Sequence, residues 1–148
     1  MINEKNLERA KNEIRKLAIK KEKPIIVLAQ NLEFNRRITE YGRFDILLSV
    51  EQSSDIKGDK IKQIDSGLNH VFAKIAAKNK VAIGIDLNSF RTREKKERAI
   101  LLEKIIQNVN ICRKAKCVIK VLNYKDEKNA FNFLISIGAS TQQAKNAI

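Results

Sequence analysis

The sequence predicts an α/β protein with one domain, in which the strands of a parallel sheet alternate with helices. Four short apolar runs recur along the chain, at residues 24–29, 44–50, 81–87 and 117–122. Continuous apolar runs of this length are typical of strands that are covered on both faces. Amphipathic segments separate the runs, and this alternation favours crossover connections between parallel strands. We therefore expect about four βα units in residues 24–148.

An amphipathic helix is expected before the first strand, within residues 1–23. Its apolar residues recur at three- and four-residue steps and form one narrow stripe, which consists of Leu7, Ala10, Ile14 and Leu17. Pro24 ends this helix, because the residue before a proline is displaced from the helical region.

Helices are also expected after each strand. The first runs from an N-cap at Asn31 to about Tyr41 and stops at Gly42. The second is capped by Asp65 or Ser66 and buries one face, made of Leu68, Val71, Phe72, Ile75 and Ala76. A long helix covers about 93–114, and two shorter helices, about 126–137 and 141–148, are divided at Gly138.

The composition indicates a polyanionic partner. The chain carries 30 Lys and Arg against 17 Asp and Glu, a formal net charge of +13. Such a surplus favours nucleic acid through its summed field and counterion release, with an anionic membrane surface as the competitor. No apolar run is long enough to span a membrane, and the charged N-terminus does not have the pattern of a signal peptide. Cys112 and Cys117 fit no metal-binding pattern, so we expect free, buried thiols and a cytoplasmic protein.

The loops that follow the strands carry the candidate binding residues, because functional groups of parallel sheets gather beyond the carboxyl ends of the strands. One long loop covers residues 51–65. Two basic clusters lie in neighbouring loops and are predicted to form one phosphate-binding patch: Lys57, Lys60 and Lys62 in the first, and Arg91, Arg93, Lys95, Lys96 and Arg98 in the second. A helix N-terminus near Thr92 is expected to add donors for an anion.

The sequence has no pattern of a known catalytic site. Its single histidine, His70, excludes a histidine-rich metal cage, and its five glycines are isolated, so there is no phosphate-binding glycine loop. Asp45 and Asp86 lie in predicted strands without a further acidic cluster beside them, and we interpret them as structural. No catalytic residue and no metal ligand is therefore assigned.

The most distinctive stretch is residues 65–76, DSGLNHVFAKIA. Gly67 allows the start of a helix to approach another backbone closely. Asn69 and His70 are then expected near the carboxyl end of the sheet, although their spacing alone favours a capped helix with a satisfied polar pair.

This stretch, followed by VAIGIDL at 81–87, resembles the signature of the archaeal and eukaryotic ribonuclease P protein subunit with a polymerase-and-histidinol-phosphatase-like (PHP-like) barrel, component 3 in archaea. Residues 24–36 resemble the strand of that family and the helix start that ends in Asn35 and Arg36. Residues 44–49 and 97–102 are similar to two further motifs. The resemblance singles out the motif residues Asn35, Arg36, Asp65, Ser66, Gly67, Asn69, His70 and Lys74.

The resemblance implies a shortened TIM-like (PHP-like) barrel or an open parallel sheet. It also implies a non-catalytic subunit that supports the catalytic RNA of ribonuclease P in removing the 5′ leader from precursor tRNA. The expected partners are that RNA, precursor tRNA and a smaller ferredoxin-like subunit. The protein itself is expected to bind no cofactor, and magnesium belongs to the RNA.

Two alternatives remain at this point, a reduced PHP-type metal-dependent phosphoesterase and a free-standing basic RNA-binding protein. The chain starts where family members are already on the helix that leads to their third strand. Its helix at 1–23 offers a side-chain stripe but no backbone partner to the first strand, so we expect an unpaired sheet edge. The isolated protein is then expected either to self-associate or to be recovered only with its ferredoxin-like partner.

Overall fold

The computed structural model of the chain describes residues 1–56 and 64–148 and contains one parallel sheet of four strands. The strands are β1 (Ile26–Leu28), β2 (Ile46–Leu48), β3 (Ala82–Asp86) and β4 (Ile119–Leu122), and they are hydrogen-bonded in sequence order. The predicted α/β class and the number of strands are therefore confirmed. The sheet is open, with β1 and β4 at its two edges.

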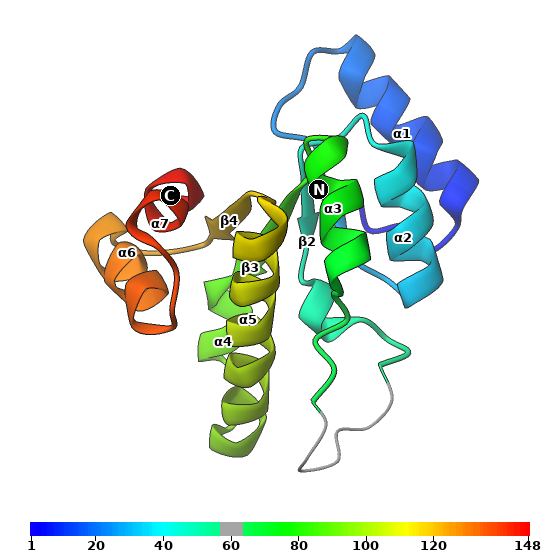
Figure 1. Ribbon diagram of the computed structural model, residues 1–148. Helices are drawn as coiled ribbons and strands as arrows, with labels where there is room; N and C mark the ends of the chain where they lie inside the picture. The colour runs from blue at the N-terminus through cyan, green and yellow to red at the C-terminus, as the bar shows by residue number, and fades with distance from the viewer. Residues whose placement is uncertain (57–63) are drawn as a thin grey trace.

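The helices lie beside one another in chain order. They are α1 (Leu7–Ile19), α2 (Leu32–Tyr41), α3 (His70–Lys78) and α5 (Lys95–Ala115), and each packs against the next. Two shorter helices, α6 (Glu127–Ser136) and α7 (Thr141–Ala147), follow β4, and α7 packs on that strand (Figure 1). The core between helices and sheet contains fully buried branched side chains, among them Ile14, Val27, Ile38, Leu47, Ile83 and Ile105.

The chain before α1 pairs with the sheet. Ile2 forms a parallel bridge beside Val27: its backbone N–H donates to the oxygen of Ile26 at 2.8 Å, and its own oxygen accepts from the N–H of Leu28 at 2.9 Å. The side chain of Ile2 is buried. The expectation that β1 lacks a backbone partner on its outer edge was therefore wrong at this position, because the residues ahead of the helix, rather than the helix itself, supply the hydrogen bonds.

Two predicted helix boundaries match the structure and one does not. Asn31 caps α2 through its side chain, and Gly42 ends that helix with a φ of 65°. The next helix begins later than predicted, because its N-cap is Asn69 and not Asp65 or Ser66. The Asp65 carboxylate instead accepts from the N–H of Gly67 and closes a turn of its own. Val71, which the sequence placed inward, is 68% exposed, since α3 buries Phe72, Ala73 and Ala76.

The long helix predicted over 93–114 is divided near its start. A short helix, α4 (Leu87–Arg91), follows β3 directly, and Thr92 is its C-terminal cap. The main helix α5 then begins at Lys95, with Glu94 at the N-cap position and no side-chain cap bond. The predicted helix N-terminus at Thr92 was therefore wrong, and a carboxylate occupies the true N-cap.

Both cysteines are buried with free thiols, as predicted. Among the described residues, no helix is long and apolar enough to cross a membrane.

Candidate nucleic-acid interface

The loops at the carboxyl edge of the sheet are joined by polar side chains. After β2 the chain forms a short 3₁₀ turn, η1 (Val50–Gln52). The Gln52 amide donates to the Ser89 hydroxyl in α4 at 2.8 Å. Asn123, after β4, donates to the carboxylate of Asp86 at 2.8 Å. The loops after β2, β3 and β4 therefore form one connected surface, as expected for the carboxyl ends of adjacent parallel strands.

Three of the predicted phosphate-binding arginines brace this edge. The Arg93 guanidinium donates to the Gln52 side-chain oxygen at 2.6 Å, and that of Arg91 donates to the backbone oxygen of Asn123 at 2.9 Å. Arg98 donates to the backbone oxygen of Arg93. All three are exposed, so part of each guanidinium still faces solvent. They fix the loops and present positive charge at the same time.

Lys95 and Lys96 occupy the exposed first turn of α5, beside these arginines in sequence. Glu94 and Glu97 lie in the same turn, and Glu97 pairs with Arg93 at 3.7 Å. Lys57, Lys60 and Lys62 lie outside the described residues, so their part in the patch stays a prediction.

Three polar side chains of the motif build the scaffold beneath this edge. Asn35 is fully buried; its side-chain oxygen accepts from the N–H of Gln30 at 2.7 Å, and its amide donates to the Ser53 hydroxyl at 2.8 Å. Ser66 is buried and donates to the backbone oxygen of Leu68. Asn69 caps α3 by accepting from the N–H of Phe72 at 2.8 Å. These side chains are used inside the protein.

Gly67 is required by its surroundings. Its φ is +75°, and a Cβ at this position would lie 2.7 Å from the backbone oxygen of Val50. The left-handed backbone and the close approach both favour glycine. The motif thus fastens the start of α3 to the turn after β2, which agrees with the close backbone approach predicted from the sequence.

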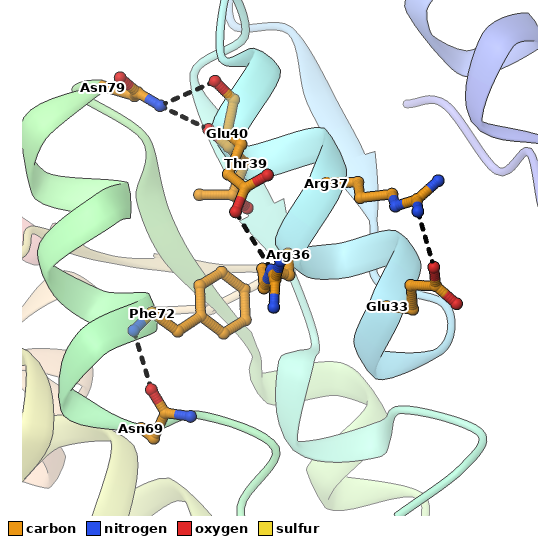
Figure 2. Close-up of polar contacts among 8 residues, drawn as sticks. All are labelled: Glu33, Arg36, Arg37, Thr39, Glu40, Asn69, Phe72 and Asn79. Carbon is orange, nitrogen blue, oxygen red and sulfur yellow. Dashed lines mark hydrogen bonds and ion pairs between the residues drawn. The ribbon is translucent and has the colours of Figure 1, made fainter.

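The remaining motif residues lie on the surface. Arg36 on α2 is exposed and pairs with Glu40 at 3.1 Å, while His70 and Lys74 are exposed on α3. Between these helices lies a groove of about 630 Å³. In Figure 2, Arg36 of α2 lies next to Phe72 of α3, with Asn69 at the start of α3, while Arg37 extends from the other side of α2 toward Glu33. The groove combines an apolar floor with a charged rim, lined in part by Leu32, Arg36, Asp65, Leu68, Val71 and Phe72.

A buried carboxyl group lies at the carboxyl edge and was not singled out from the sequence. Glu51 is 2% exposed, and one of its oxygens has no hydrogen-bond partner among the described residues. Burial, with a smaller contribution from Asp86, raises the pKa of Glu51 to about 7, although hydrogen bonds with its own backbone and with Gln52, and the charge of Lys104, lower it. Glu51 lines a hollow of about 390 Å³ together with Arg93 and Lys104. Its position directly after an apolar run could have indicated a group at the end of a strand.

Asp45 and Asp86 have structural roles. The Asp45 carboxylate accepts from the N–H of Ile25 at 2.7 Å and pairs with Lys23 at 3.7 Å. Asp86 caps α4 and accepts from Asn123. Over residues 1–56 and 64–148 no group of three or more His, Cys, Asp or Glu side chains is arranged to hold a metal ion.

No model of a known protein family matches the sequence, and no curated protein matches it either. Among solved structures, the fold is similar to that of a chain in the cryo-EM structure of archaeal ribonuclease P with mature tRNA. The TM-score is 0.72 at 21% sequence identity. The similarity covers 97% of this chain and 60% of the other, so nearly all of this protein shares the fold of somewhat more than half of that chain.

Proposed function

We propose that the chain is a non-catalytic protein subunit of ribonuclease P, which supports the catalytic RNA as it removes the 5′ leader from precursor tRNA. The observation that carries the proposal is the shared fold over 97% of the chain with a component of an archaeal ribonuclease P structure. The sequence resemblance of residues 65–76 to the PHP-like subunit supports it independently, because that resemblance was drawn from side-chain identities alone.

The surface chemistry supports an RNA-directed role. In this proposal the protein supplies positive charge through exposed residues such as Lys74, Lys95 and Lys96, and scaffold residues such as Asn35 and Gly67 hold the loops in place. The magnesium ions that serve the reaction are held by the RNA. The protein acts in the cytoplasm.

The proposal also includes partners. A smaller ferredoxin-like subunit, or a second copy of the chain, would complete the surface next to the sheet. The shared fold covers 60% of the other chain, so that chain has further residues beyond the region of similarity. The edge of β1, which Ile2 pairs at one residue, is where we expect added backbone contacts.

Two measurements test the function. The tagged chain is purified from its native cells and the bound RNA is sequenced, and we expect ribonuclease P RNA. Cleavage of precursor tRNA by that RNA is then measured across a magnesium series, and we expect the protein to lower the magnesium concentration required. Recovery of unrelated RNA without this effect would favour a free-standing RNA-binding protein.

The phosphoesterase alternative has its own readout. We expect the isolated chain to cleave neither precursor tRNA nor simple phosphoesters with any divalent metal. We expect His70→Ala to change assembly or folding, and we expect no catalytic turnover of the isolated chain that the substitution could abolish. Metal-dependent hydrolysis that disappears in His70→Ala would replace the proposal with the phosphoesterase.

A further inference from the structure

The positive charge of the connections is concentrated at the end of the sheet opposite the predicted patch. The connections that leave the strands (29–31, 49–69, 87–94 and 123–126) contain six basic and six acidic residues. Those that enter the strands (20–25, 42–45, 79–81 and 116–118) contain six basic residues and two acidic ones, although they are far shorter. The basic residues are Lys20, Lys21, Lys23, Arg43, Lys80 and Lys116, and all are exposed.

Each of the four entering turns places one basic residue in the left-handed backbone region. The φ values are 58° for Lys21, 62° for Arg43, 58° for Lys80 and 56° for Lys116. Glycine or asparagine adopts this conformation more easily than a long side chain, and glycine is the usual residue after a helix. The same unfavourable choice is repeated ahead of every strand of the sheet.

The helix dipole does not account for this choice. Cations are favoured near the carboxyl ends of helices, and Lys78 and Lys114 already provide them within the last turns of α3 and α5. A lysine in an ordinary helical conformation gives the same benefit without a left-handed backbone. The additional charge at Lys80 and Lys116 therefore points to something outside the protein.

Two residues of this row, Lys80 and Lys116, line a hollow at the amino ends of the strands. The hollow has a volume of about 530 Å³, and Lys23 and Lys120 also line it. Its floor is apolar and includes Ile46 and Ala82. The single carboxylate in it, Asp45, is already used by the N–H of Ile25 and by Lys23. In Figure 1, α3 and α5 both run upward in the picture and end at this edge.

We propose that the amino edge of the sheet is a second RNA-binding surface, separate from the patch at the carboxyl edge. Successive phosphates of one strand contact the row of Lys21, Arg43, Lys80 and Lys116. A ribose or base rests on the apolar floor between the lysines. The apolar surface is recessed, which suits a group that enters it, whereas a lipid surface is bound by apolar groups that project. The choice of RNA as the polyanion rests on the proposed function.

The test uses the intact chain and a fluorescein-labelled 20-nucleotide oligo(U), with affinity measured by anisotropy over a series of salt concentrations. The variant is Lys21→Asn with Lys80→Asn and Lys116→Asn, three residues of the row, because asparagine tolerates the left-handed backbone. We expect the slope of log affinity against log salt to fall by about 0.7 for each lost contact, and affinity at 0.1 M salt to fall on the order of 100-fold. The control, Lys5→Gln with Arg9→Gln and Lys128→Gln, removes the same charge from exposed positions elsewhere and should retain most of the slope.

A second variant excludes loss of folding. Lys80→Gly with Lys116→Gly relieves the left-handed strain, so we expect a higher melting temperature together with weaker RNA binding. Lower stability with unchanged RNA binding would assign these lysines to the helix ends and overturn the inference. An equal loss of slope in the control, Lys5→Gln with Arg9→Gln and Lys128→Gln, would also overturn it.

The remaining outcomes separate this inference from the proposed function. Phosphatidylserine vesicles provide one such outcome. If they bind the wild type but not the first variant, while the two proteins bind RNA equally well, the inference is overturned in favour of a membrane surface. If oligo(U) binding depends on the amino edge but the protein does not assist ribonuclease P RNA, the inference stands and the proposed function is overturned. If the first variant assists ribonuclease P RNA as well as the wild type does, and its oligo(U) slope is also unchanged, the proposed function stands and the inference is overturned.

Discussion

The side-chain amide of Asn35 donates a hydrogen bond of 2.8 Å to the hydroxyl of Ser53 in the interior between α2 and the turn after β2. The hydroxyl of Ser53 in turn donates to the backbone oxygen of Val50 at 2.6 Å. A single buried amide thus holds together the ends of the first two strands and the start of a helix.

We expect Asn35→Ala to lower the free energy of unfolding by about 2 kcal/mol, because it leaves the N–H of Gln30 without its acceptor in a partly buried position. Arg36→Ala, one residue later on the exposed side of α2, should cost about 0.5 kcal/mol or less. Urea unfolding measures both changes. Equal costs for the two variants would contradict the assigned role of Asn35.

Gly67 and Gly138 form a matched pair for a second prediction. Both have positive φ, at 75° and 99°, but a Cβ at Gly67 would meet the oxygen of Val50 at 2.7 Å, whereas at Gly138 the nearest atom lies at 3.8 Å. Gly138→Ala should therefore cost about 1 kcal/mol for the backbone alone. Gly67→Ala should cost at least about 1 kcal/mol more, since the steric contact adds to it. If thermal unfolding shows a larger loss of stability for Gly138→Ala than for Gly67→Ala, the close approach of Gly67 to Val50 does not determine the cost.

Glu51 should make stability depend on pH. Its pKa in the folded protein is about 7, above the value of 4.5 for an exposed glutamate, because of burial. Between these two values the folded state binds more protons than the unfolded state, so stability falls as pH rises from about 4.5 to 7 and stays lower above it. Glu51→Gln should remove this dependence and raise the stability at pH 8 by up to about 3 kcal/mol. A Glu51→Gln protein with the same pH profile as the wild type would show that the carboxyl group titrates normally.

The carboxyl-edge patch is tested most cleanly at Lys95 and Lys96, which are exposed, because Arg91 and Arg93 also brace the loops. We expect Lys95→Gln with Lys96→Gln to reduce the salt dependence of RNA binding by about 0.7 to 0.9 per lost contact, with unchanged stability. Arg93→Ala should lower both affinity and stability, since Gln52 loses its donor. An unaltered salt slope in the lysine variant would remove α5 from the interface.

The bridge at Ile2 leads to a prediction about association. Ile2→Asp places a charge at a buried position and frees the backbone groups of Ile26 and Leu28, so we expect the edge of β1 to pair between molecules. Light scattering should show larger particles than for Asn3→Asp, a change at an exposed neighbour. Leu7→Asp with Ile14→Asp should make the protein insoluble, because Ile14 is fully buried. Monodisperse monomers for all of these variants would exclude the edge as a site of association.

The strands were predictable because burial on both faces leaves continuous apolar runs, as in residues 81–87. Their lengths were overestimated, because some residues at the ends of the runs are buried but lie outside the paired strands; Val81 and Cys117 are examples. The start of α3 was misplaced because three residues capable of capping, Asp65, Ser66 and Asn69, stand close together. Sequence alone does not reveal which of them is already used in a turn.

The charged surfaces were only partly predictable for a different reason. Arg91 and Arg93 stand out as a cluster in the sequence, and the structure places them at one edge. The lysines at the amino edge are scattered along the sequence near the ends of predicted helices, where single cations are common, so no cluster marks them in the sequence. Their common location depends on the strand order, which brings Lys23, Lys80 and Lys116 to one hollow.

The strand order also bears on how the chain assembles during synthesis. Ile26 pairs with Ile46, 20 residues further along, while Ile46 pairs with Ala82 and Ile83 with Ile119, each 36 residues further along. Each strand from β2 onward therefore pairs with the strand of the preceding βα unit, which is synthesised just before it. No pair in the sheet joins strands that are distant in the order of synthesis. Contacts of this kind close loops of moderate length and favour a sequential order of folding from the N-terminus. A nascent chain that ends before β4 already contains three paired strands, with the open side of β3 as the template on which the last unit docks.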